Sequence, residues 1–428
     1  MFLGAPVYGA LFIGSLLIMF LLGKSFSMFT TSLFYSVDSF TLLAIPLFIF
    51  AGEVMGKGQM ARHLISFANS FVGRMRSGLA HVVVLACLFF GTLSGSGFAT
   101  VAAIGSIMVP EMEKHGWDRT YSTTMIVISG FLGWMIPPSI GAILYGVLAN
   151  VSVAAVFLST VIPGILVGVG YMIINYFIGE KWHHPISPLP GKRKMVDAIK
   201  EVGGTGFLAL PAICTPLVIL GGIYGGIFSP TEAAAVASLY AVIADAIFYR
   251  SVNTKTIYEA LLKTGVTTIT ILILIAFATP ITKFLLTEGV ARSMATFIVD
   301  IAHGNALVVI LIVDILILIL GMFISDIAIL IIIVPLLLPT LIPLGVNPIH
   351  AGAFILLNCG IGTFSPPFGN YLFFGSQVGD APYSEVAPRV LPFMFFCAVP
   401  VLILTSYIPQ LSLWLPSLVL GSQVVYGH

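Results

Sequence analysis

The feature that most constrains this chain is its succession of long apolar stretches that contain almost no charged residues. Only 8% of its 428 residues are Asp, Glu, Lys or Arg, whereas a soluble domain carries about 25%. A chain so poor in charge cannot cover its own surface in water and must lie in lipid. Since a membrane helix needs about 20 apolar residues, the length predicts about a dozen spans, and one membrane domain over 1–428.

Several classes of protein are excluded. The net charge of +1 implies no nucleic-acid partner. An ATP-binding loop is absent, because Ile18 stands where the pattern ending in Gly23-Lys24-Ser25 needs a glycine. Energy for any transport must therefore come from an ion gradient or from another chain. The four cysteines lie in apolar stretches without metal-ligand spacing and are interpreted as packing residues: Cys87, Cys214, Cys359 and Cys397.

The two halves of the chain repeat each other. The run 60–73 resembles the run 290–304, with Arg62 opposite Arg292. Most matches are glycine or proline, which fix backbone geometry, so they indicate a repeated fold and not merely a shared composition. The same register matches Gly91 with Gly321. After a one-residue deletion, the matched pairs include Gly133 with Gly362, Pro137-Pro138 with Pro366-Pro367, and Gly146 with Gly375.

Charge predicts that the two repeats are inverted in the membrane. The basic loops 179–204 and 250–263 flank two spans and therefore share one side, which we assign to the cytoplasm. The first matched amphipathic segment, 56–78, is basic, whereas the second, 283–304, carries mixed charge. We expect the first on the cytoplasmic face and the second on the external face, each along the interface. The predicted parts are repeat one (1–178), a loop with an inverting helix (179–229), repeat two (230–408) and a C-terminal tail (409–428).

Each half should contain a re-entrant hairpin followed by a broken helix. The predicted hairpins cover 79–110, with a turn at Leu93–Gly97 (tip one), and 305–344, with a turn near Ile324–Asp326 (tip two). The long spans after them are interrupted at Gly133–Ser139 (break one) and Gly362–Gly369 (break two). The fold class is thus an all-α polytopic membrane protein of two inverted repeats. Hydrocarbon cannot satisfy the backbone groups that such turns and breaks expose, so they must face protein or a water-filled cavity.

Small polar residues gather at these tips and breaks. Half-helix N-termini favour a carboxylate, while unwound carbonyls and hydroxyls suit sodium. We pair each tip with the break of its own half as two cation sites, with an organic substrate between them. The candidate sodium ligands are Ser94, Gly95, Gly97, Gly133, Pro137, Ser325, Asp326, Gly362, Ser365 and Pro366. The candidate substrate contacts are Ser96, Pro138, Ser139, Thr363 and Pro367.

These motifs also have purely structural interpretations, without a ligand. The run Ser94–Gly97 could serve only close helix packing, and the double prolines could be simple kinks. A break at the same place in both halves favours function. Asp326 is a charged group in an apolar run, so a functional role is the default hypothesis for it. For Asp314, a functional role and a role as a buried structural acid are equally open.

These motifs resemble one known family over almost the whole chain. The segments that carry the resemblance are Leu43–Gly52, Ser94–Gly97, Ile136–Ser139, Gly221–Ile223, Ser229–Ala235, Asn347–His350 and Ser365–Gly369. Together they are similar to the large membrane (M) subunit of tripartite ATP-independent periplasmic (TRAP) transporters. One departure is that the acid usual in the second hairpin falls where Ser325 stands, one place before Asp326.

The resemblance implies an elevator-type importer of organic acids, of the sialic acid or C4-dicarboxylate class, coupled to Na⁺ in the bacterial inner membrane. It also implies two partners, a periplasmic binding protein and a small membrane (Q) subunit, expected here as a separate chain. An ion channel or pump without organic substrate is the alternative, although too few in-membrane acids are present to form a proton relay. A membrane-embedded enzyme would need a catalytic cluster, which the histidines at span ends do not form.

Overall fold

The computed structural model describes residues 7–57, 59–182 and 195–426, and these residues form helices joined by short turns. Within the described part, seven helices are long and apolar enough to cross a membrane, or nine if each bent pair counts as one span. The expectation of about a dozen spans was wrong, because several apolar runs form half-length helices. The side chains of residues 183–201, which include most of the predicted basic loop, lie outside the described set.

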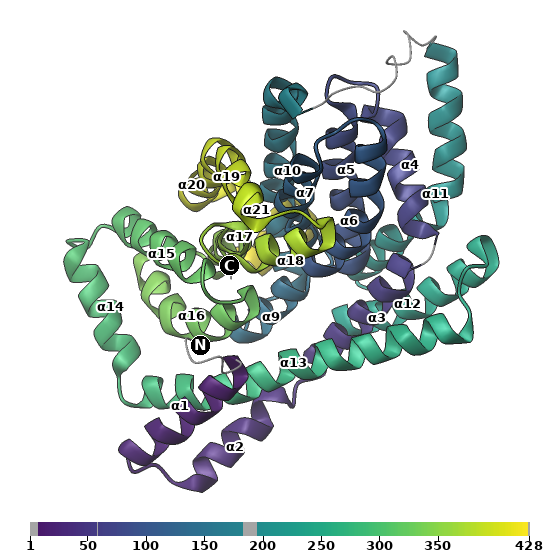
Figure 1. Cartoon of the computed structure of the whole chain (residues 1–428). Coiled ribbons are helices and arrows are strands. Elements are labelled where there is room, and N and C mark those ends of the chain that lie inside the picture. Colours follow the sequence, from purple (N-terminus) through teal and green to yellow (C-terminus); the bar gives the residue numbers. More distant parts are fainter. Residues whose placement is uncertain (1–6, 58, 183–194, 427–428) are drawn as a thin grey trace.

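The two predicted repeats are present as the same series of elements in the same order (Figure 1). The first series is α3 (Ala44–Lys57), α4 (Met60–Val72), α5 (Gly78–Ser94), α6 (Gly97–Lys114), α7 (Arg119–Gly130), α8 (Leu132–Met135), α9 (Ile140–Ala149) and α10 (Val153–Ile178). The second is α13 (Thr254–Thr287), α14 (Val290–Ile301), α15 (Ala306–Gly321), α16 (Asp326–Leu341), α17 (Pro348–Phe364), α18 (Asn370–Gly379) and the interrupted helix α19 (Tyr383–Phe393) to α20 (Val399–Tyr407).

The remaining helices frame these series. Helices α1 (Val7–Leu21) and α2 (Phe26–Val37) precede the first series, and α11 (Met195–Tyr224) and α12 (Pro230–Ala244) connect the two. The long α13 runs beneath the molecule in Figure 1 and contacts α1, α2, α3 and α16. The region predicted as a tail instead forms α21 (Gln410–Leu420) and α22 (Ser422–Tyr426), and α21 packs on α10.

Both amphipathic segments form short helices, as predicted. In α4, Ala61, Leu64 and Ala68 are buried along one face, while Arg62 and Ser66 are exposed. This spacing of three and four residues places the apolar side chains on one side of the helix. In the second repeat α14 joins hairpin two at an angle of 117° to α15, so it does not continue the hairpin arm.

The hairpins turn where the sequence predicts, with small differences in length. Hairpin one is α5 and α6, and hairpin two is α15 and α16. Helix α6 continues to Lys114, four residues beyond the predicted end of hairpin one. The breaks are narrower than predicted: they cover Ile136–Ser139 and Ser365–Gly369. Gly133, Gly362 and Thr363 therefore lie in the last turns of the helices before the breaks.

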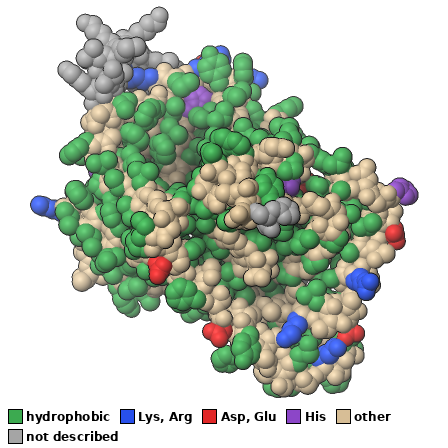
Figure 2. Space-filling model, turned by 180° about the vertical axis from the view of Figure 1, so that it is seen from behind, with side chains coloured by type: hydrophobic (Ala, Val, Ile, Leu, Met, Phe, Trp, Pro, Cys, Tyr) green, Lys and Arg blue, Asp and Glu red, His purple; other side chains and the backbone are tan. Residues whose placement is uncertain are grey.

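The outer surface agrees with a membrane environment. Large apolar side chains cover the face in Figure 2, and Phe20, Phe34 and Phe396 are each about four-fifths exposed. Lys, Arg, Asp and Glu are sparse on this face. An apolar surface of this extent cannot be left in water, so lipid or a partner must cover it.

Candidate functional site

In the first half, the hairpin tip and the helix break are joined by their backbones. The N–H of Ile140 donates to the carbonyl of Gly95 across 3.1 Å. Gly95 has a φ of +58°, a left-handed conformation that glycine adopts without steric cost. A Cβ at Gly95 would stand 2.5 Å from the Pro138 carbonyl oxygen, so the tip can lie this close to the break only as glycine.

Each hairpin also meets its own broken helix through a pair of glycines. A Cβ on Gly91 would stand 2.7 Å from the Cα of Gly133, and a Cβ on Gly321 would stand 2.6 Å from the Cα of Gly362. The repeat matches Gly91 with Gly321 and Gly133 with Gly362 in the sequence, so the second contact is the counterpart of the first. The same glycine contact therefore joins each hairpin to the broken helix of its own half. Tip two also lies at its own break, since the rings of Phe323 and Phe368 are 5.6 Å apart.

Four half-helices begin at this central region. They are α6 after tip one, α9 after break one, α16 after tip two and α18 after break two. Packing crosses between the halves, since α6 lies against α18 and α9 lies against α16. The first turns of these helices carry N–H groups without intrahelical partners and a positive partial charge, so together they favour a negatively charged ligand.

Three of the predicted serines cap these half-helices. Ser96 accepts from the N–H of Ala99, Ser139 from Ala142, and Ser325 from Ala328. The Ser139 hydroxyl also donates to the carbonyl of Trp134 across 2.5 Å. The serines thus have a structural role, as N-caps, in addition to any role in ligand binding.

The double prolines leave backbone carbonyls without their usual donors. Proline has no N–H, so Pro137 cannot donate to the carbonyl of Gly133, and Pro367 cannot donate to that of Thr363. The peptide bond between the two prolines is cis in both pairs. Ser365 and Thr363 turn their hydroxyls back onto the carbonyls of Ile361 and Gly360. Carbonyl and hydroxyl oxygens of this kind are suitable ligands for a hard cation.

Tyr371 was missed by the sequence analysis and lies at the centre of the site. Its hydroxyl donates to Oδ2 of Asp326 across 2.7 Å, while Oδ1 of Asp326 accepts from the N–H of Ile327. A Cβ on Gly97 would stand 2.5 Å from the Tyr371 hydroxyl. One buried tyrosine on α18 therefore touches the first residues of α6 and α16, that is, both hairpins. Its only signal in the sequence is a polar ring one turn after the double proline.

The two breaks differ in exposure. Every residue of Ile136–Ser139 is buried, whereas Pro367 and Phe368 are exposed. Ser94, Ser139, Thr363 and Ser365 are all at most 1% exposed. The candidate ligands of break two thus lie just beneath an open surface.

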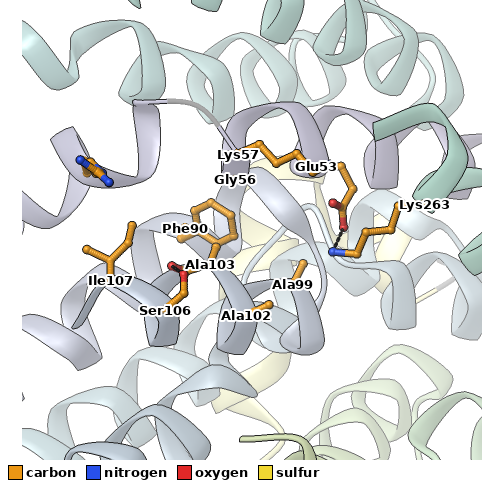
Figure 3. Close-up of a pocket in the computed structure, with 12 residues that line it drawn as sticks. Glu53, Gly56, Lys57, Phe90, Ala99, Ala102, Ala103, Ser106, Ile107 and Lys263 are labelled. Atoms are coloured by element: carbon orange, nitrogen blue, oxygen red, sulfur yellow. Dashed lines mark hydrogen bonds and ion pairs between the residues drawn. The ribbon is translucent and has the colours of Figure 1, made fainter. Parts of the chain in front are cut away.

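A cavity of about 360 Å³ lies beside hairpin one (Figure 3). Its walls come mainly from α3 and α6, with Arg62 of α4, Phe90 of α5 and Lys263 of α13. Glu53 and Lys263 form an ion pair of 2.7 Å in its wall, drawn as a dashed line in Figure 3. Beside the cavity, α3 also touches tip one, because a Cβ on Gly52 would stand 2.8 Å from the Cα of Ser94. None of the predicted ligands lines this cavity directly.

Known proteins agree with this architecture. The family model described as "Tripartite ATP-independent periplasmic transporter, DctM component" matches residues 1–411. A C4-dicarboxylate TRAP transporter large permease protein of Pseudomonas aeruginosa is 36% identical over 404 residues, which cover 94% of this chain and 92% of the relative. A sialic acid TRAP transporter large permease protein of Vibrio cholerae is 34% identical over 385 residues, covering 90% and 88%.

Among solved structures, the YdaH transporter of Alcanivorax borkumensis, described as having an unusual topology, aligns with a TM-score of 0.62 at 16% identity. The alignment covers 89% of this chain and 87% of that one. At this identity the likeness concerns the fold alone, whereas the family match and the relatives cover nearly all of the sequence. The chain therefore belongs to the DctM family, the large permease component of tripartite ATP-independent periplasmic transporters.

Proposed function

We propose that this chain imports an organic carboxylate across the bacterial inner membrane, driven by an inward sodium gradient. The observation that carries the proposal is the duplicated contact of a hairpin tip with a helix break. Each contact gathers buried hydroxyls and carbonyls that have lost their donors to proline, for example Ser94 and Gly133 in the first half. Oxygen donors at breaks of this type are how secondary transporters hold coupling ions.

The substrate would lie between the two cation sites, at the start of the four half-helices. Their N-termini supply positive partial charge, and the tips and breaks contain no Lys or Arg. Backbone N–H groups would then replace a basic side chain in binding the carboxylate. The names of the relatives include sialic acid, C4-dicarboxylate and ectoine. We place the substrate in the sialic acid or C4-dicarboxylate class, with contacts from Ser96, Pro138, Ser139, Thr363 and Pro367.

An elevator movement is the proposed mechanism. The hairpins and broken helices would form a transport body, and α3 with α13 would belong to the scaffold. The cavity in Figure 3 supports this division, because it leaves part of the boundary between α3 and α6 unfilled beside tip one. Loosely packed surfaces of this kind can slide, whereas the glycine contacts within each half hold the transport body together.

Two partners are part of the proposal. A soluble periplasmic binding protein would deliver the substrate, and a small membrane subunit would pack against the exposed apolar surface. One relative, an isethionate TRAP transporter permease protein, is longer than this chain, which covers 59% of its length.

The test is uptake into proteoliposomes that hold this chain with a candidate small subunit. A binding protein loaded with labelled sialic acid or C4-dicarboxylate is added outside, with a sodium gradient or with potassium in its place. We expect uptake only when sodium and the binding protein are both present. Uptake without the binding protein would refute the tripartite mechanism, uptake with potassium would refute sodium coupling, and ion current without uptake would favour a channel.

A further inference from the structure

A second group of buried polar side chains lies away from the tips and breaks. Asp314 on α15, Asn358 on α17 and Ser406 on α20 are 5%, 0% and 1% exposed. The Asn358 side-chain amide donates to the backbone carbonyl of Asp314 across 2.8 Å and to its Oδ1 across 3.1 Å. The Ser406 hydroxyl faces the same carboxyl group without forming a well-aligned hydrogen bond. Three helices of the second half thus meet at one carboxylate.

Three oxygen atoms in this group have no partner among the described residues. They are Oδ2 of Asp314, Oδ1 of Asn358 and Oγ of Ser406. The direction of the Asn358 amide is fixed by its two bonds to Asp314, both of which require a donor, so its oxygen must be the free atom. A buried acceptor without a partner costs about 1–3 kcal/mol. The Ser406 hydroxyl can donate to only one of the two acceptors, so at least one buried acceptor beside an uncompensated carboxylate still lacks a partner. This indicates a missing positive group.

The negative charge of Asp314 also indicates a missing positive group. Asp314 is the one charged residue of α15, and none of the ion pairs among the described residues includes it. A buried, uncompensated carboxylate is strongly unfavourable in a protein within a membrane. Carboxylate, amide carbonyl and hydroxyl oxygens are the ligand types of hard cations. We propose that Asp314, Asn358 and Ser406 bind a further sodium ion, in addition to any at the two tips.

This site is separate from tip two but mechanically connected to it. Asp314 precedes Gly321 by seven residues on α15, which is about 10 Å along the helix. Asn358 precedes Gly362 by one turn on α17. A cation bound by Asp314 and Asn358 would therefore link α15, the first arm of hairpin two, to α17, the helix that precedes break two. The inference deepens the proposed sodium coupling, and rests on it for a role in transport.

Direct sodium binding tests the site without relying on transport. The purified full chain in lipid nanodiscs is titrated with ²²Na⁺, and the number of ions bound per chain is compared with that of Asp314→Asn. The variant is nearly isosteric and removes only the charge. We expect it to lose one bound sodium ion, while Asp300→Asn, which changes an exposed acid on α14, keeps the full number. Ser406→Ala retains the charge and should bind the same ion at least severalfold more weakly.

The outcomes separate this inference from the proposed function. An unchanged sodium count in Asp314→Asn, with both proteins monodisperse, overturns the inference even if sodium-driven uptake is normal. The inference is also overturned if the wild type releases a proton on substrate binding and Asp314→Asn does not. Protonation, and not sodium, would then neutralise the Asp314 carboxylate. If Asp314→Asn fails to fold, an unchanged sodium affinity in Ser406→Ala overturns it. A lost sodium ion in a chain without sodium-driven uptake supports the site and refutes the coupling.

Discussion

At the scale of single residues, the two glycine contacts set how closely each hairpin can approach its broken helix. We predict that Gly91→Ala and Gly321→Ala each destabilise the protein by about 1–3 kcal/mol, because the new methyl group meets backbone that must move. Thermal unfolding of the purified protein measures this. Gly221→Ala on α11 is the control: nothing lies within 4 Å of its added Cβ, so its melting temperature should stay level or rise. Equal melting temperatures for all three would show that the contacts are loose.

The pair formed by Tyr371 and Asp326 is the second residue-scale case. Tyr371→Phe removes the donor to Oδ2 of a carboxylate that is 2% exposed, and we predict lower uptake with a higher sodium requirement. Asp326→Asn should shift the sodium curve in the same direction, and the double variant should be little worse than either alone, because both remove one interaction. The measurement is uptake against sodium concentration. Sodium curves that do not change would assign the pair a purely structural role.

The glycines, prolines and serines of the site could be predicted from the sequence, whereas Tyr371 could not. Gly133 and Gly362 could be found because a backbone contact permits only one residue type, so the two halves retain it. Tyr371 has no counterpart in the first half, where the repeat register places Ala142. Its partner Asp326 lies 45 residues away on another helix. Only the packing of α18 between the hairpins brings them together.

At the scale of elements, the serine caps allow helix stability to be distinguished from ion binding. Ser96, Ser139 and Ser152 each cap a helix by accepting from an N–H three residues later, but Ser152 caps α10, away from the tips. Replacement by Ala should cost about 1 kcal/mol in each case. We predict that Ser96→Ala and Ser139→Ala also weaken sodium-dependent uptake, whereas Ser152→Ala does not. Similar uptake in all three would reduce the two site serines to caps.

Element lengths explain which features of the fold could be predicted. The hairpins were found because Ser94–Gly97 interrupts an apolar run that is otherwise uniform. The number of spans was overestimated, because hydropathy cannot distinguish a crossing helix from one arm of a hairpin. Helices α5 and α17 have 17 residues each and fall below the length of a full span. The observed breaks are narrower than the predicted ones for a related reason: glycine is compatible with a last helical turn, and Gly133 and Gly362 lie in one.

At the scale of the whole molecule, an elevator requires that hairpin one move past α3, and one residue pair can test this. A Cβ on Gly56 of α3 would stand 3.7 Å from the Cβ of Ala103 on α6, where the two helices meet in the wall of the cavity of Figure 3. That separation suits a disulfide. We predict that Gly56→Cys with Ala103→Cys, once oxidised, abolishes uptake because scaffold and transport body are then tied together. Dithiothreitol should restore it, and each single variant should transport normally under both conditions. If the oxidised pair, verified as crosslinked by mass spectrometry, transports at the wild-type rate, α3 and hairpin one move as one body, and the transport body must be redrawn to include α3.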